Sequence, residues 1–150
     1  MQPSTSFSLR AAIAEDSSAI RHLVISGGIN PTGLDWRRFV VAVSPQGEVI
    51  GCGQVKPHRD GSLELASIAV TPERRGQGVA RAIIEHLLAE NQGELYLMCR
   101  SGLGGLYEKF GFRVIQPDEM PRYFRKISRL VGLVEVLRRD GESLLVMKRD

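Results

Sequence analysis

The stretch RRGQGVAR, residues 74–81, has the residue types that bind an anion at the start of a helix. The first four N–H groups of a helix have no partner within it and lie at the positive end of the helix dipole. Gly76 and Gly78 let the backbone turn and approach a ligand closely. Arg75 and Arg81 add positive charge. The stretch is typical of a diphosphate site, although a plain glycine turn before a helix can have the same sequence.

Two common phosphate-binding motifs do not fit this loop. A P-loop requires a Gly-Lys pair followed by Ser or Thr, and the sequence contains no Gly-Lys pair. A dinucleotide fingerprint requires a small residue where Arg81 stands, and its glycines follow the strand directly, whereas TPERR intervenes here. The loop therefore belongs to another class of phosphate-binding site.

The loop resembles the acetyl-coenzyme A signature of the GNAT superfamily of N-acetyltransferases, Q/R-x-x-G-x-G/A between a strand and a long helix. Residues 75–80, RGQGVA, satisfy this signature. GLYEKFGF, residues 105–112, resembles the later family element in which a tyrosine precedes a Gly-Phe strand start. Two motifs in the family's order are more specific than either alone.

The resemblance implies an α/β (α+β) fold with a central mixed, mostly antiparallel sheet, splayed central strands and flanking helices. It implies an acyltransferase that moves an acetyl group from acetyl-CoA to a primary amine by direct attack in a ternary complex. Acetyl-CoA would be a co-substrate, no metal is expected, and the acceptor would be a small molecule or a peptide or protein amino group. The alternative is a non-catalytic acyl-CoA-binding sensor.

The resemblance also assigns the contacts with acetyl-CoA. The backbone of Ile68, Ala69 and Val70 would pair with the pantetheine arm as an added strand does. The N–H of Val70 would act as the oxyanion donor to the thioester carbonyl. Arg100 stands where many relatives have an asparagine that contacts the cofactor, and an arginine there can still meet a phosphate or pantetheine oxygen. The diphosphate would lie on the loop and first helical turn: Arg75, Gly76, Gln77, Gly78, Val79, Ala80 and Arg81.

Acetyl transfer requires a neutral amine, yet amines are largely protonated near neutrality, so a base is needed. Strand alternation places Glu64, Ala66 and Ile68 on one face. Several GNAT enzymes keep a glutamate or histidine near this place, so Glu64 is the candidate base, directly or through water. The alternative for Glu64 is a solvent-exposed strand carboxylate.

A second candidate for proton transfer is Tyr107, which matches the family tyrosine and would protonate the departing thiolate besides contacting the cofactor. Without the resemblance Tyr107 would read as a core aromatic, because Leu103, Leu106 and Phe110 fall on the same helical face. The resemblance favours the catalytic role.

The elements that must position these residues follow from hydrophobic periodicity and turn residues. The pattern predicts, in order, a strand at Phe7–Ile13, a helix that Asp16 can cap, strands at 38–43, 49–58 and 63–70, a long helix after Gly76, a strand at 94–100, a short helix at Leu103–Phe110, a strand from 111, a basic amphipathic helix at about 121–138 and a closing strand at 143–149.

The basic helix at about 121–138 is open to two interpretations. It is either a surface helix with solvated arginines that covers the sheet, or a lid or anionic contact. Nucleic-acid or acidic-partner binding is the weakest alternative for the protein, because the net charge is only +3. The resemblance implies that the acceptor enters near GGINPTGLDW (27–36) and QPDEMPRY (116–123). Asp35, Asp118 and Glu119 in these segments can attract an ammonium, and the alternative for each is an ordinary turn acid.

With 150 residues, 43% of them hydrophobic, the chain is expected to form one domain, residues 1–150. It shows no apolar run long enough for a membrane and no secretion signal, so a cytoplasmic protein is expected, and the resemblance adds a homodimer as a candidate assembly. Cys52 and Cys99 lie in predicted strands without disulfide or zinc spacing. The histidines have no ligand spacing and read as surface or half-buried side chains: His22, His58 and His86.

Overall fold

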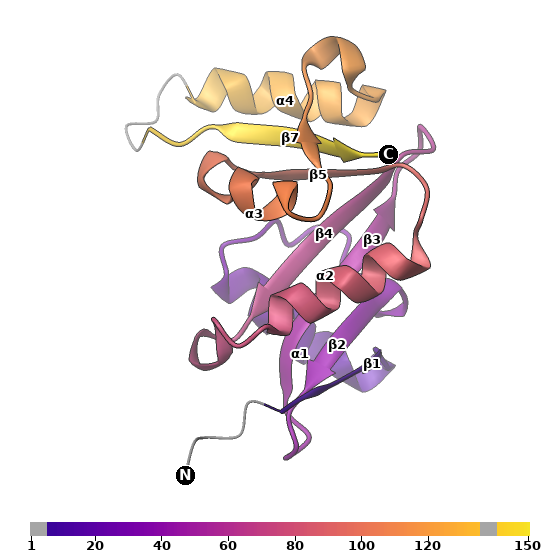
Figure 1. Cartoon of the computed structure of the whole chain (residues 1–150), viewed down its shortest axis with the longest axis vertical. Helices are drawn as coiled ribbons and strands as arrows, with labels where there is room; N and C mark the ends of the chain where they lie inside the picture. The colour runs from indigo at the N-terminus through magenta and orange to yellow at the C-terminus, as the bar shows by residue number, and fades with distance from the viewer. Residues whose placement is uncertain (1–5, 136–140) are drawn as a thin grey trace. The chain divides into compact units, whose positions relative to one another are not determined.

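The computed structural model describes residues 6–135 and 141–150. Within these residues the chain forms seven strands and four α-helices, and three of the strands follow one another between the first and second helix (Figure 1). Their bounds are β1 Ser8–Ala11, α1 Ser17–Ser26, β2 Phe39–Val43, β3 Val49–Pro57, β4 Leu63–Val70, α2 Val79–Glu90, β5 Leu95–Arg100, α3 Gly104–Glu108, β6 Arg113–Val114, α4 Arg122–Glu135 and β7 Leu144–Arg149.

The strands follow the hydrogen-bonded order β1-β2-β3-β4-β5-β7-β6. The β1–β2, β2–β3, β5–β7 and β6–β7 pairs are antiparallel, whereas β4 and β5 are parallel. The sheet is therefore mixed and mostly antiparallel, as expected. The recorded β4–β5 register consists of Glu64 opposite Tyr96. The splay of these two strands stays a prediction.

The contacts within the chain group it into two compact units. The first unit comprises the described residues of Met1–Lys56 together with Leu65–Gln92, and the second comprises Pro57–Glu64 together with Gly93–Asp150. The first unit contains the end of β4, the glycine loop and α2. The second contains the β3–β4 hairpin turn, Tyr107 and α4. The expectation of one domain over the whole chain stays a prediction.

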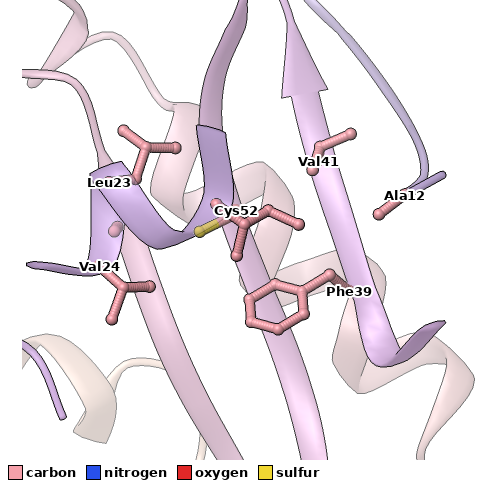
Figure 2. Close-up of a cluster of buried hydrophobic side chains, with 8 residues drawn as sticks. Ala12, Leu23, Val24, Phe39, Val41 and Cys52 are labelled. Carbon is pink, nitrogen blue, oxygen red and sulfur yellow. The ribbon is translucent and has the colours of Figure 1, made fainter. Parts of the chain in front are cut away.

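One face of the first unit is closed by α1. Leu23 and Val24 of α1 lie in one buried cluster with Phe39, Val41 and Cys52 (Figure 2). The register places Val41 opposite Cys52, so the side chains of this antiparallel pair share a face of the sheet. This apolar cluster gives the unit a hydrophobic core on the α1 side.

The opposite face of the first unit is closed by α2, as Figure 1 shows. Its apolar residues at helical spacing are buried, among them Val79, Ile83, Leu87 and Leu88. The helix packs very close to β3. A Cβ added at Gly53 would lie 2.7 Å from Cγ2 of Ile83. A glycine is therefore needed at this position of β3 for α2 to pack as it does.

The core of the second unit lies between its strands and α4. Tyr96 of β5 and Val146 of β7 share a buried cluster with Phe124 of α4, and the ring of Phe124 stacks on that of Tyr96 at 5.3 Å between centroids. The expected basic helix is present as α4, Arg122–Glu135. The remainder of the expected range, 136–138, lies outside the described residues.

Three local expectations were wrong in detail. Strand β1 ends at Ala11, before the expected Ile13, because a 3-10 turn begins at Ala14. Asp16 does not cap the next helix through its side chain, since its carboxylate accepts from Arg10 Nη1 at 2.7 Å and from the Ile13 N–H at 2.8 Å.

The short helix expected at Leu103–Phe110 is split into a 3-10 turn, Ser101–Leu103, and α3. Leu103 and Leu106 are 46% and 40% exposed, so the expected apolar face is not buried in this structure. Among residues 6–135 and 141–150, the helices are all too short or too polar to cross a bilayer.

Candidate active site

The glycine loop ends at the N-terminus of α2 in a conformation that suits a bound anion. Gly78 is the residue before the helix and has φ +84°, and Gly76 has φ +76°. L-residues with a Cβ pay about 1–2 kcal/mol in this left-handed region, so glycine is the natural choice. An added Cβ would meet no atom within 4 Å at either position. Space is therefore open beside both glycines.

The residues of this loop divide into anchors and exposed groups. The side chain of Val79 is buried in the first unit and fixes the start of α2. Gln77 Nε2 donates to the Glu73 carbonyl at 3.3 Å, while its Oε1 is buried and has no hydrogen-bond partner among the described residues. Arg75 and Arg81 are exposed. The loop thus offers cationic side chains to solvent and keeps its backbone anchored.

The end of β4 leads directly into this loop within the same unit. Ile68 and Val70 are half-buried and Ala69 is buried. The N–H of Thr71, the next residue, donates to the Ile50 carbonyl at 2.9 Å. The helix start, the loop and the edge of β4 are therefore consecutive parts of one compact unit, which is the arrangement that an extended acyl-CoA chain requires.

Strand β4 contains a left-handed residue that the sequence did not reveal. Ser67 has φ +60° and is buried. Its hydroxyl accepts from Gln54 Nε2 at 2.9 Å, and its carbonyl accepts from Cys52 Sγ at 3.5 Å. Regular alternation is interrupted at Ser67, so it no longer places Ile68 on the face of Glu64 and Ala66, and the shared face of Glu64 and Ala66 stays a prediction.

Gln54 links this irregular part of β4 to the loop after α1. Its side chain is fully buried, and its Nε2 donates to the Gly33 carbonyl at 3.2 Å as well as to Ser67. Lys56 Nζ donates to the Thr32 carbonyl at 3.1 Å. Two side chains of β3 therefore hold the segment that was expected to line the acceptor site.

Tyr107 lies on α3 in the second unit, where its ring packs edge-on against Phe112 at 6.2 Å between centroids. Burial, followed by the proximity of the Cys99 thiol, raises the pKa of Tyr107 to about 12. The phenol therefore keeps its proton at neutral pH, which is the state needed to donate one.

Arg100 ends β5 in the second unit. Its guanidinium lies 3.9 Å from the Glu142 carboxylate, and both side chains are largely exposed. An exposed ion pair of this length contributes little, so Arg100 remains able to exchange this partner for a phosphate.

Glu64 is not a solvent-exposed carboxylate, so the alternative considered for it was wrong. Its Oε1 lies 2.8 Å from Nε2 of His58, and the two side chains are only 9% and 7% exposed. The ring of His58 stacks on Tyr123 at 3.6 Å between centroids. The candidate base is therefore part of a buried histidine–carboxylate pair in the second unit.

The sequence analysis missed the residues that surround this pair. His58 was read as a surface or half-buried side chain without a role, and Tyr123 and Asp60 were not singled out. A signal was present, since the Asp-Gly turn at 60–61 closes a hairpin and brings the residues on either side of it together. The His58 N–H donates to the Ser62 carbonyl across this hairpin at 2.9 Å.

Two of the three expected acceptor carboxylates, Asp35 and Glu119, are already engaged. Asp35 accepts from the N–H of Arg37 at 3.1 Å, and hydrogen bonding to that N–H is the main cause of its lowered pKa. Glu119 accepts from Arg113 Nη1 at 2.8 Å, which lowers the pKa of Glu119. Either group would have to give up or share this partner to bind an ammonium.

The exposed side of α4 carries a basic cleft with a volume of about 390 Å³. Arg125 is fastened to the preceding turn through the carbonyls of Pro117 and Met120. The residues that line the cleft are Arg122, Arg125, Lys126, Arg129 and Leu130.

The cysteines are free and buried in β3 and β5, as expected, and burial raises the pKa of Cys52 to about 12 and that of Cys99 to about 11. Within the described ranges there is no group of three or more side chains suited to hold a metal ion.

Comparisons with known proteins agree with this fold. No curated protein matched the chain. N-acetylglutamate synthase from Neisseria gonorrhoeae, solved with coenzyme A and N-acetyl-glutamate, superposes with a TM-score of 0.74 at 21% identity over 96% of this chain. This chain spans 35% of that enzyme.

Two further structures match along nearly their whole length. Rv2747 from Mycobacterium tuberculosis, solved with CoA and a second ligand, has a TM-score of 0.70 and 23% identity over 95% of this chain and 98% of its own. A GNAT-family acetyltransferase from Staphylococcus aureus Mu50 has a TM-score of 0.71 and 12% identity over 96% and 98%.

The family description "Acetyltransferase (GNAT) domain" matches residues 35–114, which include β4, the glycine loop, α2 and Tyr107. This match covers more than half of the chain. The protein therefore belongs to the GNAT family of acetyltransferases.

Proposed function

We propose that this protein transfers an acetyl group from acetyl-CoA to a primary amine by direct attack within a ternary complex. The observation that carries the proposal is the β4–loop–α2 segment, in which Gly76 and Gly78 adopt left-handed conformations beside open space at a helix N-terminus. Family membership and the CoA-bound structures with this fold support the same conclusion.

The chain's main role toward acetyl-CoA is to bind and orient it. The N–H groups of the loop and the first turn of α2 would hold the diphosphate, with Arg75 and Arg81 adding charge. The edge of β4 at Ile68 and Ala69 would pair with the pantetheine arm. The N–H of Val70 would donate to the thioester carbonyl, where negative charge develops.

Two side chains would handle the protons of the reaction. An acceptor ammonium loses one proton before attack, which we assign to the buried carboxylate of Glu64. It loses a second as the amide forms, and that proton restores the phenol of Tyr107, which has given its own proton to the thiolate of coenzyme A. The products are an N-acetyl amine, a free thiol and one proton released to solvent. Arg100 would give an additional contact with a phosphate or pantetheine oxygen.

The acceptor is best sought with a panel of amines. The related synthase was solved with N-acetyl-glutamate, so glutamate heads the panel, followed by other amino acids, polyamines, arylamines, aminoglycosides and peptide N-termini. Thiol release from acetyl-CoA is the readout. We expect release with one class of amine, and release with none of them in folded protein that binds acetyl-CoA would exclude this function.

Binding of acetyl-CoA without thiol release is also what a non-catalytic acyl-CoA-binding module predicts. For such a module, acetyl-CoA would bind by calorimetry, while Tyr107→Phe would change neither binding nor any other property tied to the ligand. A loss of thiol release in Tyr107→Phe at unchanged acetyl-CoA affinity would decide for the enzyme.

The basic cleft of α4 supports a second, weaker candidate, an anionic partner such as a nucleic acid. Four of its five lining residues are cationic. Binding of a polynucleotide that weakens steeply with salt and is lost when Arg122 and Arg129 are replaced by glutamine would support it.

The cytoplasmic location and the homodimer also stay predictions. Light scattering of the purified protein tests the homodimer.

A further inference from the structure

The β3–β4 hairpin and α4 enclose a histidine–carboxylate pair that the proposed function does not yet use in full. Nε2 of His58 lies 2.8 Å from Oε1 of Glu64, and neither side chain is more than 9% exposed. The chain contains a second pair of the same chemistry on α2, His86 with Glu90 at 3.2 Å, but those side chains are 39% and 61% exposed. The contrast singles out the buried pair.

The direction of this hydrogen bond follows from the ionisation state of Glu64. When Glu64 is ionised its carboxylate only accepts hydrogen bonds, so Nε2 of His58 is the donor. In the neutral ring the other nitrogen, Nδ1, then holds a lone pair. With a carboxylate and a neutral imidazole the pair carries one negative charge and has one site for an added proton.

The ring of His58 is held in this orientation from several sides. Tyr123 stacks on it with the planes 16° apart, and the edge of Phe124 meets it at 5.6 Å and 85°. Asp60 fastens the hairpin to α4, because its Oδ2 accepts from the N–H of Tyr123 at 2.9 Å. Such fixed contacts are typical of a histidine whose orientation matters for proton transfer.

The charged and titratable groups that face the pair come from the hairpin, α4, β5 and β7. Burial opposes the ionisation of Asp60, but hydrogen bonds from Ser62 and the Tyr123 N–H lower its pKa overall, so it is a carboxylate at neutral pH. Burial, followed by the charge of Glu64, raises the pKa of Tyr123, so its phenol is neutral. Tyr96 stands opposite Glu64 in the β4–β5 register, and Lys148 Nζ lies 5.8 Å from its ring centre.

We propose that His58 and Glu64 act as one proton-accepting unit for the acceptor amine, in which the proton assigned above to Glu64 resides on the ring of His58. The inference rests on the proposed function. In this step an N–H bond of the ammonium breaks and nitrogen keeps the electron pair. One proton is added to the pair, which becomes an imidazolium bound to a carboxylate. The proton returns to solvent after the product leaves.

The test is the pH dependence of kcat/KM in His58→Gln, compared with His86→Gln as the matched control. Glutamine can still donate a hydrogen bond to Glu64 but does not titrate. We expect His58→Gln to lower kcat about 10²-fold, with the KM for acetyl-CoA unchanged, and to move the acidic limb of the profile to lower pH. The limb moves in that direction because a carboxylate alone is a weaker base than imidazole. His86→Gln should leave both the rate and the limb as they are.

A purely structural role predicts a different set of results. If His58 only joins the hairpin to α4, then His58→Gln would change stability while the acidic limb of kcat/KM stays in place, and the proposal is overturned. Should His58→Gln not fold, Tyr123→Leu keeps His58 and removes its stacking partner. In Tyr123→Leu we expect the acidic limb of the kcat/KM profile to shift. An acidic limb that stays in place contradicts the proposal.

A nitrogen-detected NMR titration of the histidine rings in the unaltered protein completes the test. The His58 ring should gain one proton at Nδ1 over the pH range of the acidic limb, while Nε2 stays protonated throughout. A His58 ring that does not titrate in that range overturns the proposal even if the protein is an active acetyltransferase. Conversely, the titration can be present without any thiol release, and that outcome refutes the proposed function and, with it, the catalytic role of the pair.

Discussion

The two compact units present opposite kinds of chemistry. In the first, the candidate groups are main-chain N–H groups of an exposed loop, shaped by Gly76 and Gly78. In the second, they are side chains withdrawn from water, Tyr107 and the His58–Glu64 pair. A backbone site binds an anion without any change of protonation, whereas an acid or base must have its pKa adjusted by its surroundings. Substitutions should therefore affect affinity in the first unit and rate in the second.

The largest effect is expected from the second unit. Replacing Tyr107 by phenylalanine removes the proton donor to the thiolate and keeps the ring that packs on Phe112. We expect kcat to fall about 10²-fold or more, as for loss of a general acid, whereas acetyl-CoA affinity, to which Tyr107 is one contact among several, should change far less. Steady-state kinetics and calorimetry on the same preparation measure the two quantities. A normal kcat would remove Tyr107 from the mechanism.

A weaker affinity for acetyl-CoA should follow from a change in the loop. In Gly78→Val the left-handed φ of +84° becomes costly by about 1–2 kcal/mol, so affinity should fall about tenfold. Gly47→Val is the matched control, since Gly47 has φ +86° and equally open space but lies in the β2–β3 turn. Both variants should lose stability, and only Gly78→Val should lose affinity. Equal acetyl-CoA affinity in the two would contradict a backbone site in the loop.

The buried phenol of Tyr107 should make stability depend on pH in the alkaline range. Its pKa is raised from 10.0 to about 12, so between these values the unfolded chain releases a proton that the folded chain keeps. The contribution to the free energy of unfolding is complete below pH 10 and is lost as the pH rises through about 12.

The alkaline decrease in the free energy of unfolding due to Tyr107 amounts to about 2 kcal/mol once the partial exposure of this side chain is allowed for. Urea unfolding of the unaltered protein and Tyr107→Phe at several pH values measures it. The burial of Cys52 and Cys99 gives a similar alkaline loss in both proteins and cancels in the comparison. Parallel curves for the two proteins would mean that the phenol is not shielded from water.

The smallest effect is expected from a charged side chain at the edge of the loop. Arg81 is exposed and paired with Glu85 at 2.9 Å, so Arg81→Gln should change stability by less than about 0.5 kcal/mol. It should weaken acetyl-CoA binding about threefold at low salt and less at high salt. Arg21→Gln on α1 is the control for a surface charge of the same unit. A loss that does not diminish with salt would argue against a charge contact.

The sequence predicted the first unit's site better than the second unit's. Two glycines, two arginines and regularly spaced apolar residues are local signals, and the long helix expected after Gly76 is present as α2, which begins at Val79. The left-handed Ser67 was not predictable, because serine is ordinary in strands and its conformation coincides here with bonds to Gln54 and Cys52 from the neighbouring strand.

The buried pair of the second unit depends on contacts that sequence patterns do not contain. The hairpin register brings His58 near Glu64, but its burial comes from Tyr123 and Phe124 of α4, far along the chain. The apolar spacing of α3 predicted a buried face, and this prediction was wrong for a related reason. No other element of the described structure covers Leu103 and Leu106. The local sequence pattern predicts that a helix or strand exists more reliably than it predicts which other elements pack against it.

Amide hydrogen exchange with and without acetyl-CoA tests the central claim most directly. If the loop binds the diphosphate and β4 pairs with the pantetheine arm, the ligand should slow exchange at residues 76–81 and 68–70 and leave β1 unchanged. Unaltered exchange at both segments, at an acetyl-CoA concentration that saturates binding by calorimetry, would contradict the assignment of the cofactor site.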